Sequence, residues 1–172
     1  MTHMRGLLEG LVVGSTMIAM LVSPFVRAAA TEGRIRVLQE TPLSAAADVP
    51  ADVRKECNML GDELPKAIVR SSRRVALVPS QHELMDKTGK YLFIEITSIG
   101  ARAAGALSGP KRMNIRGALI ENGKEIADFQ ATRGSYAASG TCSMLTKSEK
   151  DLGADIGTWL ENPKPHSHLG DK

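Results

Sequence analysis

Two cysteines, far apart in the chain, are the residues whose type and number most clearly imply chemistry. Cys57 and Cys142 are the only cysteines among 172 residues. In an oxidising compartment an isolated pair of cysteines forms a disulfide, which here closes a loop of about 86 residues. The loss of chain entropy in the unfolded state makes such a cross-link worth about 4–5 kcal/mol as an upper figure. The alternatives are two buried thiols or one reactive cysteine.

A reactive cysteine is the weaker interpretation. Cys142 precedes a predicted helix, and a helix N-terminus can activate a thiol. A nucleophilic cysteine also needs a base, and the histidines beyond the first thirty residues are His82, His166 and His168. No motif connects any of these to Cys142. We therefore predict no catalytic residue, and an enzyme would need a site assembled from residues remote in the sequence.

The histidine pair near the C-terminus could bind a divalent metal ion. His166 and His168 supply two imidazoles, whereas tight sites need three or four ligands in fixed geometry. We expect no cofactor, and we keep metal handling through His166 and His168 as an alternative function.

Two loops rich in small residues, 101–110 and 134–141, are the candidate binding surfaces. Loops carried by a rigid sheet commonly hold binding residues. A phosphate-binding loop is not indicated, because Pro110 separates Gly109 from Lys111 and a strand follows. The candidate binding residues in and beside these loops are Arg102, Lys111, Arg112, Ser135, Tyr136 and Ser139.

The first thirty residues have the pattern of a secretory signal peptide. One basic residue, Arg5, precedes an apolar stretch over 7–26, and three alanines end at Ala30. The alternative is an uncleaved anchor, although the run is short for a membrane span. Cleavage after Ala30 would leave no stable membrane anchor and 142 residues, with 20 basic and 18 acidic side chains. This near-balance argues against nucleic acid as a partner, because a nucleic-acid-binding protein requires a concentrated basic face.

The mature chain is expected to hold one globular domain over 50–163. Residues 31–49 are interpreted as a flexible leader, apart from a brief strand near Ile35, and residues 164–172 as a disordered tail. An apolar stripe predicts a helix over 48–71, which Pro65 should kink or split after Leu64. This stripe comprises Val53, Cys57, Leu60, Leu64 and Ile68.

Strands are predicted over 74–79, 90–100, 111–121 and 124–136, with the hairpin signal Asn122-Gly123 between the last two and a bulge in the return strand. A final helix should begin near Thr146, with Glu149 completing a capping box. Gly153 and Gly157 suggest close packing of this helix on the sheet. The predicted fold class is α+β (or an α/β sandwich): a mostly antiparallel four-stranded sheet carrying an N-terminal and a C-terminal helix. The apolar face of the last helix comprises Leu152, Ile156, Trp159 and Leu160.

Residues 53–163 resemble a class of small exported bacterial envelope domains. The resemblance rests on the strand at 74–79, the strand at 91–100 with its glycine-rich sequel, the hairpin at 120–127 and the helix end at 156–163. Such domains occur in envelope lipoproteins and are similar in layout to the periplasmic domain of the curli secretion pore. The resemblance implies no catalytic residues. This chain has no cysteine near Ala30 that could be acylated, which is a departure from the lipoproteins.

The sequence therefore predicts a secreted or periplasmic protein of the bacterial envelope with a binding or scaffolding role and no enzymatic activity. Its expected partner is an envelope protein or surface component. A periplasmic hydrolase with a site assembled from remote residues is the first alternative, and metal handling is the second.

Overall fold

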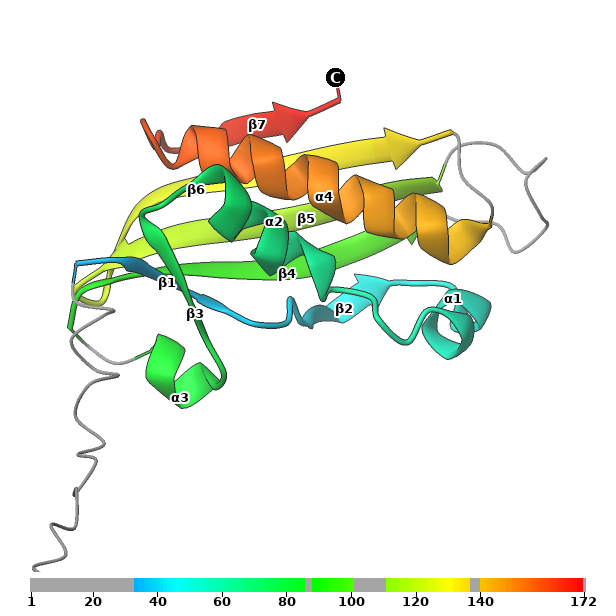
Figure 1. Cartoon of the computed structure of the whole chain (residues 1–172), viewed down its shortest axis with the longest axis horizontal. Helices are drawn as coiled ribbons and strands as arrows, with labels where there is room; N and C mark the ends of the chain where they lie inside the picture. Colours follow the sequence, from blue (N-terminus) through cyan, green and yellow to red (C-terminus); the bar gives the residue numbers. More distant parts are fainter. Residues whose placement is uncertain (1–32, 86–87, 101–110, 137–139, 172) are drawn as a thin grey trace, which may run out of the picture.

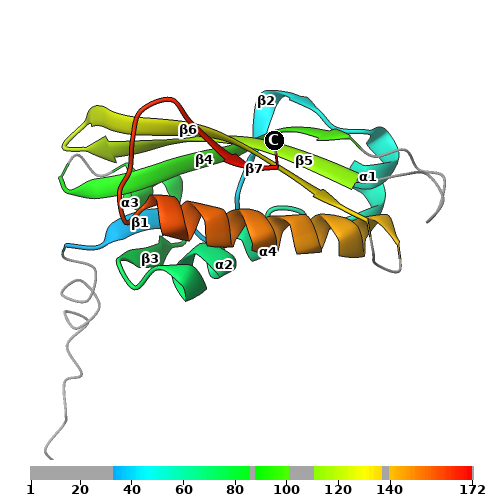
Figure 2. The same ribbon diagram turned by 90° about the horizontal axis from the view of Figure 1, so that it is seen from above.

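The computed structural model of the chain describes residues 33–85, 88–100, 111–136 and 140–171. These residues form one mixed sheet of seven strands and four helices. The two longest helices lie side by side against one face of the sheet, so the molecule has two layers (Figure 1 and Figure 2). The segment predicted to be a signal peptide, 1–30, lies outside the described residues.

Three long antiparallel strands form the centre of the sheet: β4 (Lys90–Gly100), β5 (Lys111–Glu121) and β6 (Lys124–Ser135). Asn122 and Gly123 both have positive φ, as the predicted hairpin turn requires. Leu119 pairs with Ala127 and Ile120 with Glu125, so Ile126 is the extra residue of a bulge. The predictions of this hairpin and of its bulge are therefore confirmed.

Shorter strands extend the sheet on both sides of this centre. The order is β3-β1-β4-β5-β6-β7, and β2 also pairs with β4. Every pairing outside the central three strands is parallel among the described residues. The prediction of a mostly antiparallel four-stranded sheet is thus wrong in strand number and in direction. The added strands are β1 (Ile35–Leu38), β2 (Leu43–Asp48) and β7 (Ser167–Gly170), and the predicted strand at 74–79 is β3 (Val75–Val78).

The brief strand expected near Ile35 is confirmed as β1, but the segments expected to be a flexible leader and a disordered tail also contain β2 and β7. These two strands are short and mostly small or polar, so side-chain pattern gives little sign of them. Backbone pairing orders them, because each strand satisfies main-chain donors and acceptors of a long neighbour. The tail is also held by side chains: the Trp159 indole N–H donates to Ser167 Oγ at 3.0 Å, and Gly134 N–H donates to Asp171 at 2.7 Å.

The single helix predicted over 48–71 is divided into α1 (Ala51–Glu56) and α2 (Glu63–Ser71). The break lies at 57–62, before the proline that was expected to cause it. Pro65 lies in the first turn of α2, where its missing N–H is not needed for an intrahelical bond. Gly61 turns the chain with a φ of 96°. A short helix, α3 (Gln81–Leu84), follows β3 and is capped by Ser80, which accepts from Glu83 N–H.

The last helix, α4 (Thr141–Trp159), packs on both α2 and the sheet. It begins earlier than the predicted start at Thr146. The apolar face predicted for it is confirmed, since Leu152, Ile156 and Leu160 are fully buried and Trp159 packs edge-on against Phe129. Its two glycines face α2 and not the sheet as predicted. A Cβ at Gly153 would lie 2.8 Å from Leu64 O, so glycine permits the close approach of the two helices.

Candidate functional site

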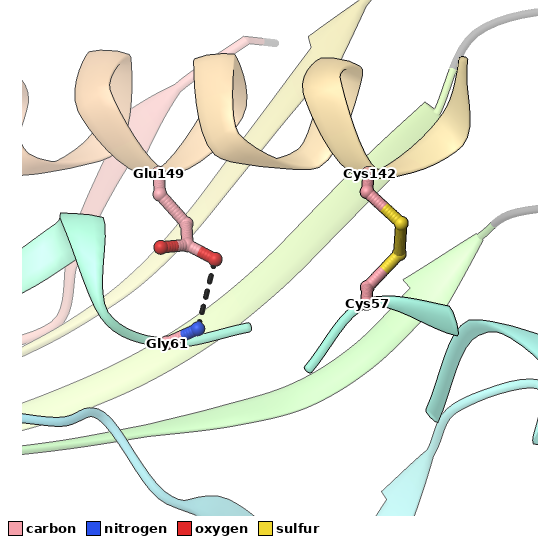
Figure 3. The surroundings of a disulfide bond; sticks show 4 residues. All are labelled: Cys57, Gly61, Cys142 and Glu149. Atoms are coloured by element: carbon pink, nitrogen blue, oxygen red, sulfur yellow. Dashed lines mark hydrogen bonds between the residues drawn. A yellow bond between two sulfur atoms is a disulfide. The ribbon is translucent and has the colours of Figure 1, made fainter. Parts of the chain in front are cut away.

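A disulfide joins Cys57, at the C-terminal end of α1, to Cys142, in the first turn of α4. The two Cα atoms are 5.3 Å apart, within the usual range for such a bond. Figure 3 shows the cross-link beside the start of α4. Because both thiols of the chain are used in this bond, neither is available as a nucleophile. The cross-link also fixes one end of the loop 57–62.

The other end of loop 57–62 is held by a buried carboxylate. Glu149 lies two turns after Cys142 on the same face of α4 and accepts hydrogen bonds from the N–H groups of Gly61 and Glu63, both at 2.9 Å. Figure 3 shows the bond from Gly61. The N–H of Glu63 belongs to the first turn of α2 and has no intrahelical partner, and Gly61 lies two positions before that helix. The predicted capping box of Thr146 and Glu149 is therefore wrong, because this side chain caps a different helix.

Burial raises the pKa of the Glu149 carboxyl group, and the hydrogen bonds from Gly61 and Glu63 oppose that rise. The negative charge of Asp62 adds to it. The side chain is 1% exposed, so it is removed from solvent almost completely. Its two oxygens are each engaged by a backbone N–H, which indicates a structural role for this acid.

Between these two attachments, loop 57–62 and the first turns of α4 form the walls of a solvent-accessible cavity of about 450 Å³. Pockets that hold small molecules span about 300–1,000 Å³. Its apolar lining includes the disulfide, the buried side chain of Leu145, the half-buried side chain of Leu60 and Met59, which is 60% exposed. We call this cavity the disulfide pocket.

The charged lining of the disulfide pocket consists of two lysines and two glutamates, and Glu149 is the buried one of the four. Lys147 and Lys150 project from α4, and each has one acidic neighbour: Asp151 at 2.7 Å and Glu63 at 3.9 Å. Both lysines remain more than half exposed. Glu56, at the end of α1, is the exposed acid of the lining.

The residues predicted to form a binding surface do not gather at this pocket. Lys111 and Ser135 are buried and pair across β5 and β6, whereas Arg112 and Tyr136 are exposed. Ser135 Oγ has no hydrogen-bond partner among the described residues. Arg102 and Ser139, with the loop 101–110, lie outside the described residues.

The two histidines proposed for metal binding have separate surroundings. The backbone N–H of His166 donates to Asp128 Oδ1 at 2.7 Å, and its ring Nδ1 lies 3.2 Å from the same carboxylate. His168 belongs to β7 and pairs with Gln130. Within the described ranges, no group of three or more histidine, cysteine, aspartate or glutamate side chains is placed to hold a metal ion.

Sequence reasoning identified the disulfide and missed the pocket beside it. One signal was present: Glu149 lies on the same helical face as Leu145, Leu152 and Ile156, so a charge interrupts an apolar stripe. Such a charge, when buried, needs partners. The partners of Glu149 are Gly61 and Glu63, before and at the start of α2. The sequence gives no measure of their distance from α4.

In the part of the chain that the structure describes, none of the helices has both the length and the hydrophobicity needed to span a membrane.

No family model and no curated protein matches this chain. Among solved structures, it is similar to a PelC dodecamer from Paraburkholderia phytofirmans, with a TM-score of 0.45 and 10% identity over 71% of this chain and 86% of that one. A single-substitution variant of that protein has a TM-score of 0.45 and 12% identity, over 70% of this chain and 86% of that one. A Xanthomonas campestris protein described by the family model DUF330 has a TM-score of 0.43 and 14% identity, over 74% of this chain and 83% of that one.

Proposed function

We propose that the chain is an exported binding domain of the bacterial envelope, without enzymatic activity, and that its ligand occupies the disulfide pocket. The observation that carries this proposal is the attachment of loop 57–62 to α4 at both ends, through Cys142 and through Glu149. A wall fixed in this way is ordered before the ligand arrives, so binding does not incur the entropic cost of ordering it.

The same cross-link supports the proposal of export. Disulfides persist outside the reducing cytosol, and residues 1–30 have the composition of a signal peptide. Export would remove that segment and let the two sulfurs join. The scaffolding role that the sequence allows is compatible with this compartment, but the pocket favours binding.

The hydrogen bonding of Glu149, the one buried acid of the lining, also favours binding over catalysis. Glu149 has its oxygens occupied by backbone N–H groups, and Lys147 has a carboxylate beside it. The Glu149 contacts hold the two walls together, and the Lys147–Asp151 pair lies within α4. The arrangement supports a receptor for a small molecule.

Native mass spectrometry of the chain secreted into a bacterial periplasm tests the proposal. We expect residues 31–172, two hydrogens lighter than the reduced chain, carrying a non-covalent adduct. Thr146 lines the pocket and is half-buried, so Thr146→Trp should fill the cavity and remove the adduct. Thr158→Trp, at an exposed position near the other end of α4, is the matched control and should retain it.

Two outcomes of this experiment would contradict the proposal. The first is an adduct that Thr146→Trp leaves in place, which would put the ligand elsewhere. The second is recovery of the full-length chain, uncleaved and without an adduct.

A further inference from the structure

The lining of the disulfide pocket also indicates the chemical class of its ligand. We infer that the pocket binds an amphiphile with one apolar chain and one anionic headgroup. This inference rests on the proposed function and narrows it to a ligand class.

The inner part of the pocket suits an apolar chain. Leu60, Leu145 and the two disulfide sulfurs offer no strong hydrogen-bonding groups to a ligand. Met59 adds a flexible thioether at an exposed position, and methionine side chains adapt to ligands of irregular shape. A chain that enters here leaves water for an apolar surface, which is favourable in proportion to the area buried.

The outer part of the pocket suits a negative charge. Lys147 and Lys150 lie three positions apart on one turn of α4, and both are more than half exposed. Their acidic neighbours lie on the same helix and at the start of α2, while Glu56 approaches from α1. The first turn of α4 lines the pocket through Cys142 and Ser143 and carries no acidic residue, so the positive end of the helix dipole adds to the positive potential there.

The charge pattern therefore distinguishes between headgroups. A carboxylate or a phosphate monoester gains two ammonium neighbours in a partly desolvated site, whereas a quaternary ammonium group is repelled by both. We assign the pocket to a monomeric ligand and not to a membrane surface, because the apolar groups line a cavity and not a flat patch.

Titration calorimetry on the mature oxidised protein provides the test, with decanoate below its micelle-forming concentration as the probe. Decanoate should bind one to one. Affinity should rise about threefold to fourfold per methylene from hexanoate to decanoate, which corresponds to about 0.8 kcal/mol for each buried group. Decyltrimethylammonium, which has the same chain and the opposite charge, should bind at least tenfold more weakly.

Variants of the two lysines locate the headgroup of the ligand. Lys147→Gln with Lys150→Gln should weaken decanoate binding at least fivefold and should make the remaining binding insensitive to salt. Lys124→Gln, at an exposed lysine at the start of β6, is the control and should leave the affinity unchanged. Thermal unfolding of each variant checks the fold, and exposed ion pairs contribute less than about 1 kcal/mol to it.

Equal affinity for the cationic amphiphile, or decanoate binding that survives Thr146→Trp, would overturn the inference. So would retention on phosphatidylglycerol vesicles without saturable decanoate binding. If a periplasmic adduct is still lost in Thr146→Trp while decanoate fails to bind, the ligand class is wrong and the proposed function stands.

Discussion

Glu149 is a charged side chain within the apolar face of a helix, and its position explains how two separate segments are held together. Its carboxylate accepts hydrogen bonds from the N–H groups of Gly61 and Glu63, which would otherwise be unpaired. Leaving such donors unsatisfied in the interior costs about 1–3 kcal/mol each. The residue therefore stabilises the loop 57–62 although burial disfavours its charge.

The raised pKa of Glu149 predicts the sign of a pH effect. From the ordinary value of 4.5 up to the raised pKa, the folded chain retains a proton that the unfolded chain has released. Stability gained from that proton is lost as the pH rises through this window. Glu149→Gln removes the titrating group, so the difference in unfolding free energy, wild type minus variant, should fall between pH 4 and pH 7.

Urea unfolding across this pH range measures that difference. Glu63, Asp128 and Asp171 have lowered pKa values and act in the opposite direction, but they are present in both proteins and their effects largely cancel. A difference that grows with pH would show that the N–H groups of Gly61 and Glu63 outweigh burial at Glu149.

At the scale of elements, the disulfide connects the end of α1 to the start of α4 across 85 positions of the chain. It lies at one end of α4, while the packing of Gly153 and Gly157 against α2 lies further along the same helix. The bond thus constrains a part of α4 that the helix–helix contact does not reach.

Replacing both cysteines, Cys57→Ser with Cys142→Ser, should lower the free energy of unfolding by about 4 kcal/mol, because the unfolded chain regains the entropy of a long loop. Chemical denaturation of the oxidised wild type and the variant measures the loss. The reduced wild type is the control and should match the variant. A loss below about 1 kcal/mol would mean that the cross-link hardly constrains the unfolded chain.

The sequence predicted β4, β5 and β6 and the hairpin between the last two, because β-branched residues and the Asn122-Gly123 turn are local signals. It did not predict β2 or β7, whose residues are small or polar and which are ordered by pairing with β4 and β6. The same difference between local signals and long-range contacts applies to the site. Both cysteines could be identified from composition, whereas the role of Glu149 depends on a contact with α2 across 86 positions or more.

At the scale of the whole molecule, the two layers leave two surfaces that could receive a ligand. One is the disulfide pocket at the edge of the helical layer. The other is the face of the sheet opposite the helices, where Asn114 donates to Ser98 Oγ at 2.7 Å and accepts from Thr132, and Arg116 pairs with Glu95. The polar groups on that face engage one another across strands, which leaves the pocket as the better receptor.

Amide chemical-shift mapping distinguishes these two surfaces and tests the pocket directly. The probe is a small-molecule extract of a bacterial envelope, in separate aqueous and organic fractions, added to the ¹⁵N-labelled mature protein. We predict that one fraction shifts amides in loop 57–62 and in residues 142–150, with little change elsewhere. Shifts concentrated around Asn114, Arg116 and Gln130, or a spectrum unchanged by both fractions, would contradict the assignment of the disulfide pocket as the binding site.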